Sequence, residues 1–193
     1  MRRAAAFLDR DGVINIDHGY VSRREQFDWV PGVLPAATRL HRAGYALVVV
    51  TNQSGIGRGL YSEASFATLT GWMRDEFDAA GAPLAGVYYC PHHPVDAIAP
   101  YRIACDCRKP APGMLLRAAR ELDLDLSRSL MFGDRESDLQ AAQAAGVQRR
   151  YLLGTDGISL PAAPATPIAR ASFPSLAAAV DVLLPAASGA CSA

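Results

Sequence analysis

Short apolar runs alternate with segments of helical periodicity along most of this chain. The clearest apolar run, residues 45–50, is rich in valine and has no charged position, which is typical of a strand covered on both faces. The same pattern predicts five strands in all. We expect them at residues 4–8, 45–50, 85–89, 129–132 and 147–153.

Between the strands, apolar residues recur with the spacing of helices. The longest such segment begins after Ser62, a favoured N-cap residue, and carries an apolar stripe from Phe66 to Phe77. Strands that alternate with helices predict a three-layer, Rossmann-like α/β fold, in which helices cover both faces of a parallel sheet. We expect the helices at residues 34–43, 63–80, 114–122, 138–145 and 173–184.

Length and composition are those of one globular domain. The 193 residues are enough to bury a core, and no internal repeat or linker divides them. We expect one domain over residues 1–184, with a surface loop rich in proline and alanine at 155–171. A disordered tail is expected at residues 185–193.

Charge and hydropathy limit the class of partner. Basic and acidic residues both number 19, so the net charge is zero and a broad nucleic-acid surface is not expected. No apolar run reaches membrane-spanning length, and acidic residues interrupt the N-terminal apolar stretch too early for a signal peptide. The sequence therefore predicts a cytoplasmic protein with no nucleic-acid or membrane partner.

Polar side chains follow three of the predicted strands. Asp9 and Asp11 follow the first strand, Thr51 follows the second, and Asp134 follows the fourth. An isolated Asp-x-Asp-Gly is more often a simple turn, but the carboxyl ends of parallel strands meet at one sheet edge, where ligands bind. Carboxylates that converge there repel one another unless a cation lies between them, and Mg²⁺ prefers oxygen ligands. Together with Lys109, this set predicts a site for a phosphoryl group.

A second candidate metal site lies in the irregular segment before Lys109. Cys90 and His92 are two positions apart, as are Cys105 and Cys107, so each pair can chelate from an extended chain. Three thiolates and one imidazole form a common structural zinc site with no open position. His93 is the alternative histidine, and a disulfide or free thiols are the alternatives to zinc. We expect this clasp to hold the loop that carries the lysine.

Four motifs, taken in order, resemble those of the haloacid-dehalogenase superfamily. The resemblance spans roughly residues 4–153 and implies the fold of that superfamily and a phosphoric monoester hydrolase activity. The motifs are Asp9-x-Asp11-Gly12, Thr51-Asn52, Lys109 and Gly133-Asp134-x-x-x-Asp138.

The resemblance implies a role for each motif residue. Asp9 would attack phosphorus and form an aspartyl-phosphate, while Asp11 would protonate the leaving oxygen and then activate water. Thr51 and Lys109 would stabilise the phosphoryl group. Asp134 would bind Mg²⁺ with the Asp9 side chain and the Asp11 carbonyl.

Further segments narrow the resemblance to one branch of the superfamily, the capless phosphatases of heptose bisphosphates and of histidinol phosphate. The resemblance favours removal of the 7-phosphate of a heptose 1,7-bisphosphate, in the synthesis of nucleotide-activated heptose for lipopolysaccharide core or surface glycans. Histidinol phosphate is the alternative substrate, and a catalytically idle phosphosugar-binding module is a third possibility. The segments are Asp-Arg-Asp-Gly-Val-Ile-Asn, Thr-Asn-Gln-Ser-Gly, Cys-Pro-His-His-Pro and Cys-Asp-Cys-Arg-Lys-Pro.

Without a cap domain, short loops must supply the substrate contacts, and such a domain is expected to be a monomer. Arg108 and Arg135 suit the second phosphate of a bisphosphate. Members of this branch often have lysine at the position of Arg135. Here a guanidinium, which can donate two parallel hydrogen bonds, replaces the ammonium group of that lysine. The expected substrate-binding residues are Asp17, His18, Gly19, Tyr20, Asn52, Gln53, Ser54, Arg108 and Arg135.

Overall fold

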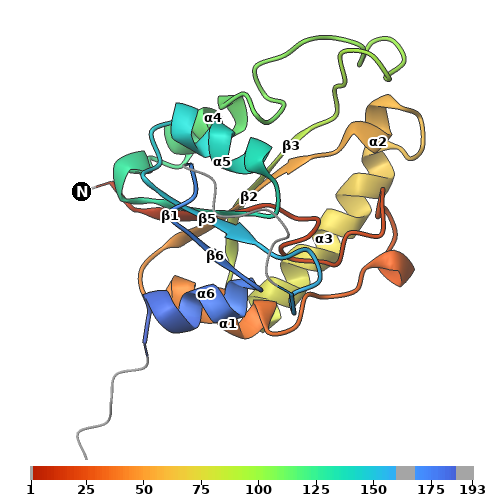
Figure 1. Cartoon of the computed structure of the whole chain (residues 1–193). Coiled ribbons are helices and arrows are strands. Elements are labelled where there is room, and N and C mark those ends of the chain that lie inside the picture. Colours follow the sequence, from red (N-terminus) through yellow and green to blue (C-terminus); the bar gives the residue numbers. More distant parts are fainter. Residues whose placement is uncertain (1, 160–167, 186–193) are drawn as a thin grey trace, which may run out of the picture.

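Six parallel strands form one sheet in the computed structural model, which describes residues 2–159 and 168–185 (Figure 1). Their order across the sheet is β3-β2-β1-β4-β5-β6. The strands are β1 (Ala5–Leu8), β2 (Ala46–Asn52), β3 (Leu84–Cys90), β4 (Leu130–Gly133), β5 (Arg149–Leu153) and β6 (Ala171–Phe173).

Helices cover both faces of the sheet, with α1, α3 and α6 on one face and α4 and α5 on the other (Figure 1). Among the residues described, no helix combines the length and apolar character needed to cross a membrane. The helices are α1 (Val33–Arg42), α2 (Ser54–Gly57), α3 (Glu63–Ala79), α4 (Gly113–Glu121), α5 (Glu136–Ala144) and α6 (Leu176–Leu183), and two 3-10 turns are η1 (Arg24–Gln26) and η2 (Leu126–Arg128).

The side chains of the central strand alternate between two apolar cores. Leu8 packs in the core that contains Phe77 of α3, whereas Phe7 packs in the core that contains Leu115 of α4. Every side chain of β1 is buried, so this strand is stable only between two others, here β2 and β4. Its position fixes Asp9, the next residue, at the carboxyl edge of the sheet.

The alternation of strands and helices predicted from the sequence is confirmed, with the ends of the elements moved by a few residues. Ser62 caps α3 as expected, because its hydroxyl accepts a hydrogen bond from the Ser65 N–H at 3.0 Å. A 3.6-residue apolar period was therefore sufficient to predict the long helices, and continuous apolar runs were sufficient to predict the long strands.

One strand and one α-helix were not predicted. The sequence suggested a surface loop up to residue 171 and a helix from 173, but Ala171–Phe173 forms the edge strand β6 beside β5. The polar segment after β2 contains the single-turn helix α2 rather than only loop. Both elements are too short for a periodic pattern, and β6 depends on its pairing with β5. Residues 160–167 of the predicted loop and 186–193 of the predicted tail lie outside the described residues.

The position of Phe7 in the central strand gives a stability prediction. Phe7→Ala should lower the free energy of unfolding by about 3–5 kcal/mol, because it removes a large side chain from a core that cannot fully collapse. Val182→Ala, at a position of α6 that is 65% exposed, is the control and should change it by less than about 0.5 kcal/mol. Urea denaturation measures both values, and equal effects of the two substitutions would contradict this packing.

Candidate active site

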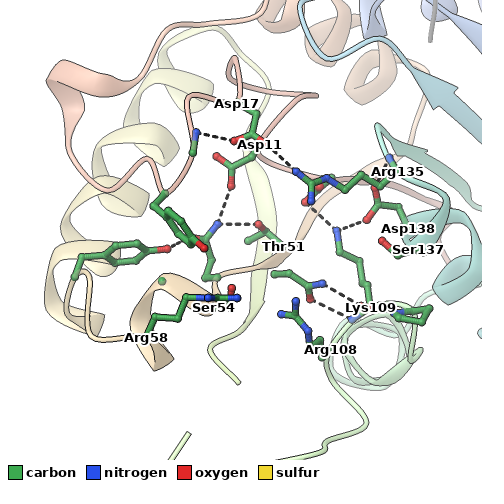
Figure 2. A pocket seen from close by; sticks show the side chains of 18 residues that line it. Asp11, Asp17, Thr51, Ser54, Arg58, Arg108, Lys109, Arg135, Ser137 and Asp138 are labelled. Atoms are coloured by element: carbon green, nitrogen blue, oxygen red, sulfur yellow. Dashed lines mark hydrogen bonds and ion pairs between the residues drawn. The ribbon is translucent and has the colours of Figure 1, made fainter. Parts of the chain in front are cut away.

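The ends of β1, β2 and β4 and the loop before α4 meet at the carboxyl edge of the sheet, around a hollow of about 580 Å³ (Figure 2). This volume is within the range of small-molecule sites. All the catalytic and substrate-binding residues expected from the sequence line it, except His18. The imidazole of His18 instead pairs with the Asp28 carboxylate at 2.7 Å on the exposed surface. The topology therefore gathers residues that are far apart in the sequence into one cavity.

Lys109 lies at the centre of a buried ion-pair cluster. Its Nζ is 2.9 Å from Asp9 Oδ1 and 2.7 Å from Asp138 Oδ1, and it donates to the Val50 carbonyl at 2.8 Å. The Asn52 side chain bonds both the N–H and the carbonyl of Lys109, each at 3.1 Å. Burial alone would lower the pKa of Lys109, but the two carboxylates outweigh it and raise that pKa above its usual value. The lysine is therefore held charged beside Asp9.

Three carboxylates crowd this cluster. Oxygen atoms of Asp9, Asp134 and Asp138 lie within 4.8 Å of one another. Burial, followed by the charges of the neighbouring carboxylates, raises the pKa of Asp134, and burial with the charge of Asp138 raises the pKa of Asp9 despite Lys109. Asp134 Oδ1 is buried, and no residue that the structure describes forms a hydrogen bond with it. These carboxylates fit a cation that prefers oxygen ligands.

The turn after β1 admits only glycine at position 12. A Cβ at Gly12 would lie 2.6 Å from Asp134 Oδ2, and the φ of +84° is in the left-handed region.

Asp138, the remaining carboxylate, is held by Lys109 and by the N–H of Arg135 at 3.0 Å. Asp138 therefore supports Lys109, which leaves Asp9 and Asp134 for a cation.

The carboxylate of Asp11 is held by three other side chains. Arg10 Nη2 donates to both of its oxygens at 3.0 and 3.1 Å. Asn15 Nδ2 donates to Oδ1 and Gln53 Nε2 to Oδ2, both at 3.0 Å. Tyr61 donates to the Gln53 side-chain oxygen at 2.5 Å and thereby orients it. Two aspartates that are two residues apart therefore have different surroundings, as different chemical roles require.

Arg10 and Arg58 are site residues that the sequence did not reveal. Arg10 is only 1% exposed, although a charged side chain beside two aspartates suggests a solvated turn. The one available signal was its position after a buried strand. Arg58 lines the hollow at the end of α2, the helix that was not predicted.

The predicted cysteine and histidine clasp is brought together as one cluster of Cys90, His92, Cys105 and Cys107. Sulfur–sulfur distances are 3.2 to 3.6 Å, so the thiols are free rather than joined in a disulfide. A tetrahedral zinc site, with bonds of about 2.3 Å, places its sulfurs about 3.8 Å apart. His92 Nδ1 lies 3.4 Å from Cys107 Sγ. The clasp therefore has the composition and nearly the spacing of a zinc site.

His93 is oriented away from this cluster. Its Nδ1 accepts hydrogen bonds from the N–H groups of Val95 and Asp96 at 3.3 and 2.9 Å. His92, by contrast, contributes a backbone carbonyl that accepts from Arg108 Nη1 at 3.2 Å. The clasp is thus linked to the residue next to Lys109.

Comparison with known proteins places the chain in a family. A family profile described as HAD-hydrolase-like matches residues 106–175. The D-glycero-beta-D-manno-heptose-1,7-bisphosphate 7-phosphatase of Vibrio cholerae is 51% identical over 155 residues, which is 80% of this chain and 83% of the relative. The Escherichia coli K12 protein of the same name is 52% identical over 151 residues, covering 78% of this chain and 79% of the relative.

A solved structure agrees with this assignment. The D,D-heptose 1,7-bisphosphate phosphatase from B. bronchiseptica, complexed with magnesium and phosphate, superposes with a TM-score of 0.79 at 35% identity, covering 94% of this chain and 98% of that one. The parallel sheet with helices on both faces matches the fold that the sequence resemblance implied. The chain therefore belongs to the haloacid-dehalogenase-like hydrolases, in the family of the heptose-1,7-bisphosphate 7-phosphatases.

Proposed function

We propose that this chain is a Mg²⁺-dependent phosphatase that removes the 7-phosphate of D-glycero-D-manno-heptose 1,7-bisphosphate. The observation that carries the proposal is the contact of Lys109 with Asp9 and Asp138 in a hollow of suitable size. The named relatives favour the heptose bisphosphate over histidinol phosphate. An idle binding module is disfavoured, because every expected catalytic residue is present and lines the hollow.

Asp9 is the proposed nucleophile. A carboxylate oxygen attacks phosphorus, the bond from phosphorus to the sugar oxygen breaks, and the phosphoryl group becomes bonded to Asp9. Lys109 opposes the rise that burial causes in the pKa of Asp9, and it neutralises charge on the transferring group. Thr51, buried beside them at the end of β2, offers its hydroxyl to a phosphate oxygen.

Asp11 is the proposed acid and base. It gives a proton to the departing sugar oxygen and later takes one from the water that attacks phosphorus. That second attack breaks the bond from phosphorus to Asp9 and releases inorganic phosphate. The Asp11 carboxylate is oriented for both steps by hydrogen bonds from Arg10, Asn15 and Gln53.

Asp9, Asp134 and the main-chain carbonyl of Asp11 are the proposed Mg²⁺ ligands. The buried, unpartnered Oδ1 of Asp134 and the raised pKa values of Asp9 and Asp134 support this set within the described chain. When bound, the cation supplies positive charge that keeps these carboxylates ionised and offsets the charge of the phosphoryl group. The B. bronchiseptica relative was solved with magnesium and phosphate.

A structural zinc ion is proposed for the clasp of Cys90, His92, Cys105 and Cys107. Burial raises the pKa of the Cys90 thiol, so its metal-binding thiolate needs a cation beside it. The clasp ends shortly before Lys109 and bonds Arg108 through the His92 carbonyl. Its proposed task is to hold that loop against Asn52 and so keep the lysine in place.

Replacement of the nucleophile tests the chemistry. Asp9→Asn should lower Mg²⁺-dependent phosphate release by a factor on the order of 10³ or more, because an amide cannot form the intermediate. The matched control is Asp75→Asn, at an exposed position of α3, which should leave the rate unchanged. Phosphate release is followed by a colorimetric assay. If Asp9→Asn retained more than a tenth of the rate, the nucleophile would be another group.

Substrate choice tests the proposed activity. Values of kcat/KM for both anomers of D-glycero-D-manno-heptose 1,7-bisphosphate should exceed the value for histidinol phosphate by at least about 100-fold, because two phosphates engage more charged donors than one. NMR of the product should show loss of the 7-phosphate. A preference for histidinol phosphate would refute the proposed substrate.

Metal analysis tests the clasp. The purified protein should hold about one zinc per chain, and His92→Ala should lose most of it. His93→Ala, the neighbouring control, should keep its zinc, since that imidazole bonds backbone N–H groups instead. Plasma emission spectrometry gives both contents. Equal retention in the two variants would exclude His92 as a ligand.

A further inference from the structure

The side-chain amide of Gln53 is engaged with three neighbouring side chains inside the hollow. The residue is only 2% exposed. Its Nε2 donates to Asp11 Oδ2 at 3.0 Å and to Thr51 Oγ1 at 2.9 Å, and its Oε1 accepts from the Tyr61 hydroxyl at 2.5 Å. An amide carries two N–H donors, so neither remains for a substrate. The residue that the sequence suggested as a substrate contact therefore has another task.

This amide links two groups that have separate roles in the proposed chemistry. In Figure 2, the dashed lines that reach Asp11 and Thr51 come from one nitrogen. The Thr51 hydroxyl accepts from that nitrogen, and no residue of the described chain accepts the proton of the hydroxyl itself. A hydroxyl that accepts on one side is free to donate on another. The Thr51 proton is thus available for a phosphate oxygen, and its direction is restricted.

Tyr61 fixes the direction of the amide. The NH2 group of Gln53 has to face Asp11, because an amide oxygen at that place would meet a carboxylate oxygen without a proton between them. The Tyr61 hydroxyl then donates to the amide oxygen on the other side. Burial raises the pKa of Tyr61 to about 12, so this hydroxyl keeps its proton near neutral pH.

The backbone holds both Gln53 and Tyr61 in place. The Gln53 N–H donates to the Cys90 carbonyl at 2.8 Å, which ties the end of β2 to the end of β3. Residue 53 also directly precedes α2, whose Gly55 lies against the ring of Tyr61. A Cβ at Gly55 would lie 2.2 Å from Tyr61 Cε1, so this contact needs glycine. The fold thus sets the position of the pair before any substrate binds.

We propose that Gln53 is a positioning residue that directs the Thr51 hydroxyl and the Asp11 carboxylate at one phosphoryl group. Tyr61 holds it in that orientation. The inference rests on the proposed function, in which Thr51 binds the transferred group and Asp11 protonates the leaving oxygen. A displacement of about 1 Å in such a group can slow catalysis about 100-fold. Loss of the amide should therefore lower the rate of the chemistry and leave recognition of the sugar intact.

Three substrates separate this role from the alternatives. D-glycero-D-manno-heptose 1,7-bisphosphate and glycerol phosphate both release an alkoxide that must be protonated as it leaves, but only the first contains the heptose. The third, p-nitrophenyl phosphate, releases an anion that is stable without a proton. A contact with the sugar would matter for the heptose substrate alone, and a role only in folding would matter equally for all three. A role in positioning Asp11 matters more for the two alkyl phosphates than for the nitrophenyl ester.

Gln53→Met keeps the length of the side chain without its donors. It should lower kcat/KM about 10- to 100-fold for both alkyl phosphates. The loss for p-nitrophenyl phosphate should be at least about threefold smaller, because only the contribution through Thr51 remains. Tyr61→Phe keeps the ring against Gly55, so it should fold normally and rank the substrates in the same order, with losses of about 3- to 10-fold. Circular dichroism shows whether each variant is folded.

Two matched controls change the same residue types elsewhere. Tyr88→Phe removes a hydroxyl that bonds Glu121 at 3.0 Å outside the hollow, and Gln143→Met alters an exposed position of α5. Both should stay within about twofold of the parent on all three substrates. Asp11→Asn is the reference, because loss of the proposed acid should give the same order of losses at a larger size.

Two results would overturn the proposal. A loss confined to the heptose substrate would make Gln53 a substrate contact, and an equal loss on all three substrates would make its role structural. Failure of the proposed function looks different. Equal losses on all three substrates in Asp11→Asn would refute the acid role of Asp11. A parent enzyme that hydrolyses the heptose bisphosphate no faster than glycerol phosphate would refute the proposed substrate.

Discussion

The charged side chain of Lys109 is buried, and the other groups of the site are arranged so that they compensate its charge. A buried cation is tolerated only where carboxylates and hydrogen-bond acceptors surround it, and Asp9, Asp138 and the Val50 carbonyl do so within 3 Å. Removal of one partner from such a cluster typically destabilises a protein by about 3–5 kcal/mol. The same contacts that satisfy the lysine also place a charged donor beside the proposed nucleophile.

The cluster depends on parts of the chain that are distant in sequence. Burial of β1 fixes Asp9, the start of α5 fixes Asp138, and Asn52 at the end of β2 bonds the backbone of Lys109. The lysine itself comes from an irregular segment, so its position relies on the clasp that precedes it. A metal ion in the clasp would thus stabilise the loop that carries Lys109, and a cation at Asp9 and Asp134 would stabilise the carboxylates beside that lysine.

Much of this arrangement was predictable from the sequence. Continuous apolar runs identified the long strands, and the polar residues just after them identified Asp9, Thr51 and Asp134, because strand ends meet at one edge whatever their distance in sequence. The paired spacing of cysteine and histidine identified the clasp. The structure brings these residues together, and each of them was identified from a local pattern.

What the sequence did not reveal depends on tertiary contacts. The three residues of β6 are ordered by pairing with β5, and α2 is a single turn packed under the clasp loop. Arg10 is buried because Asp11 and the Val21 carbonyl accept its hydrogen bonds. Arg58 reaches the hollow only through α2. The periodicity of apolar residues in the sequence carries no information about such contacts.

The central claim is that Asp9, held by Lys109, carries the phosphoryl group. Rapid acid quenching during turnover of the heptose bisphosphate, followed by borohydride reduction and peptide mass spectrometry, tests it directly, because an acyl phosphate is reduced to an alcohol whereas a free carboxylate is not. The account predicts conversion of the side chain at position 9 to that of homoserine. Conversion at another aspartate, or an unchanged position 9 in an enzyme that turns over, would contradict it.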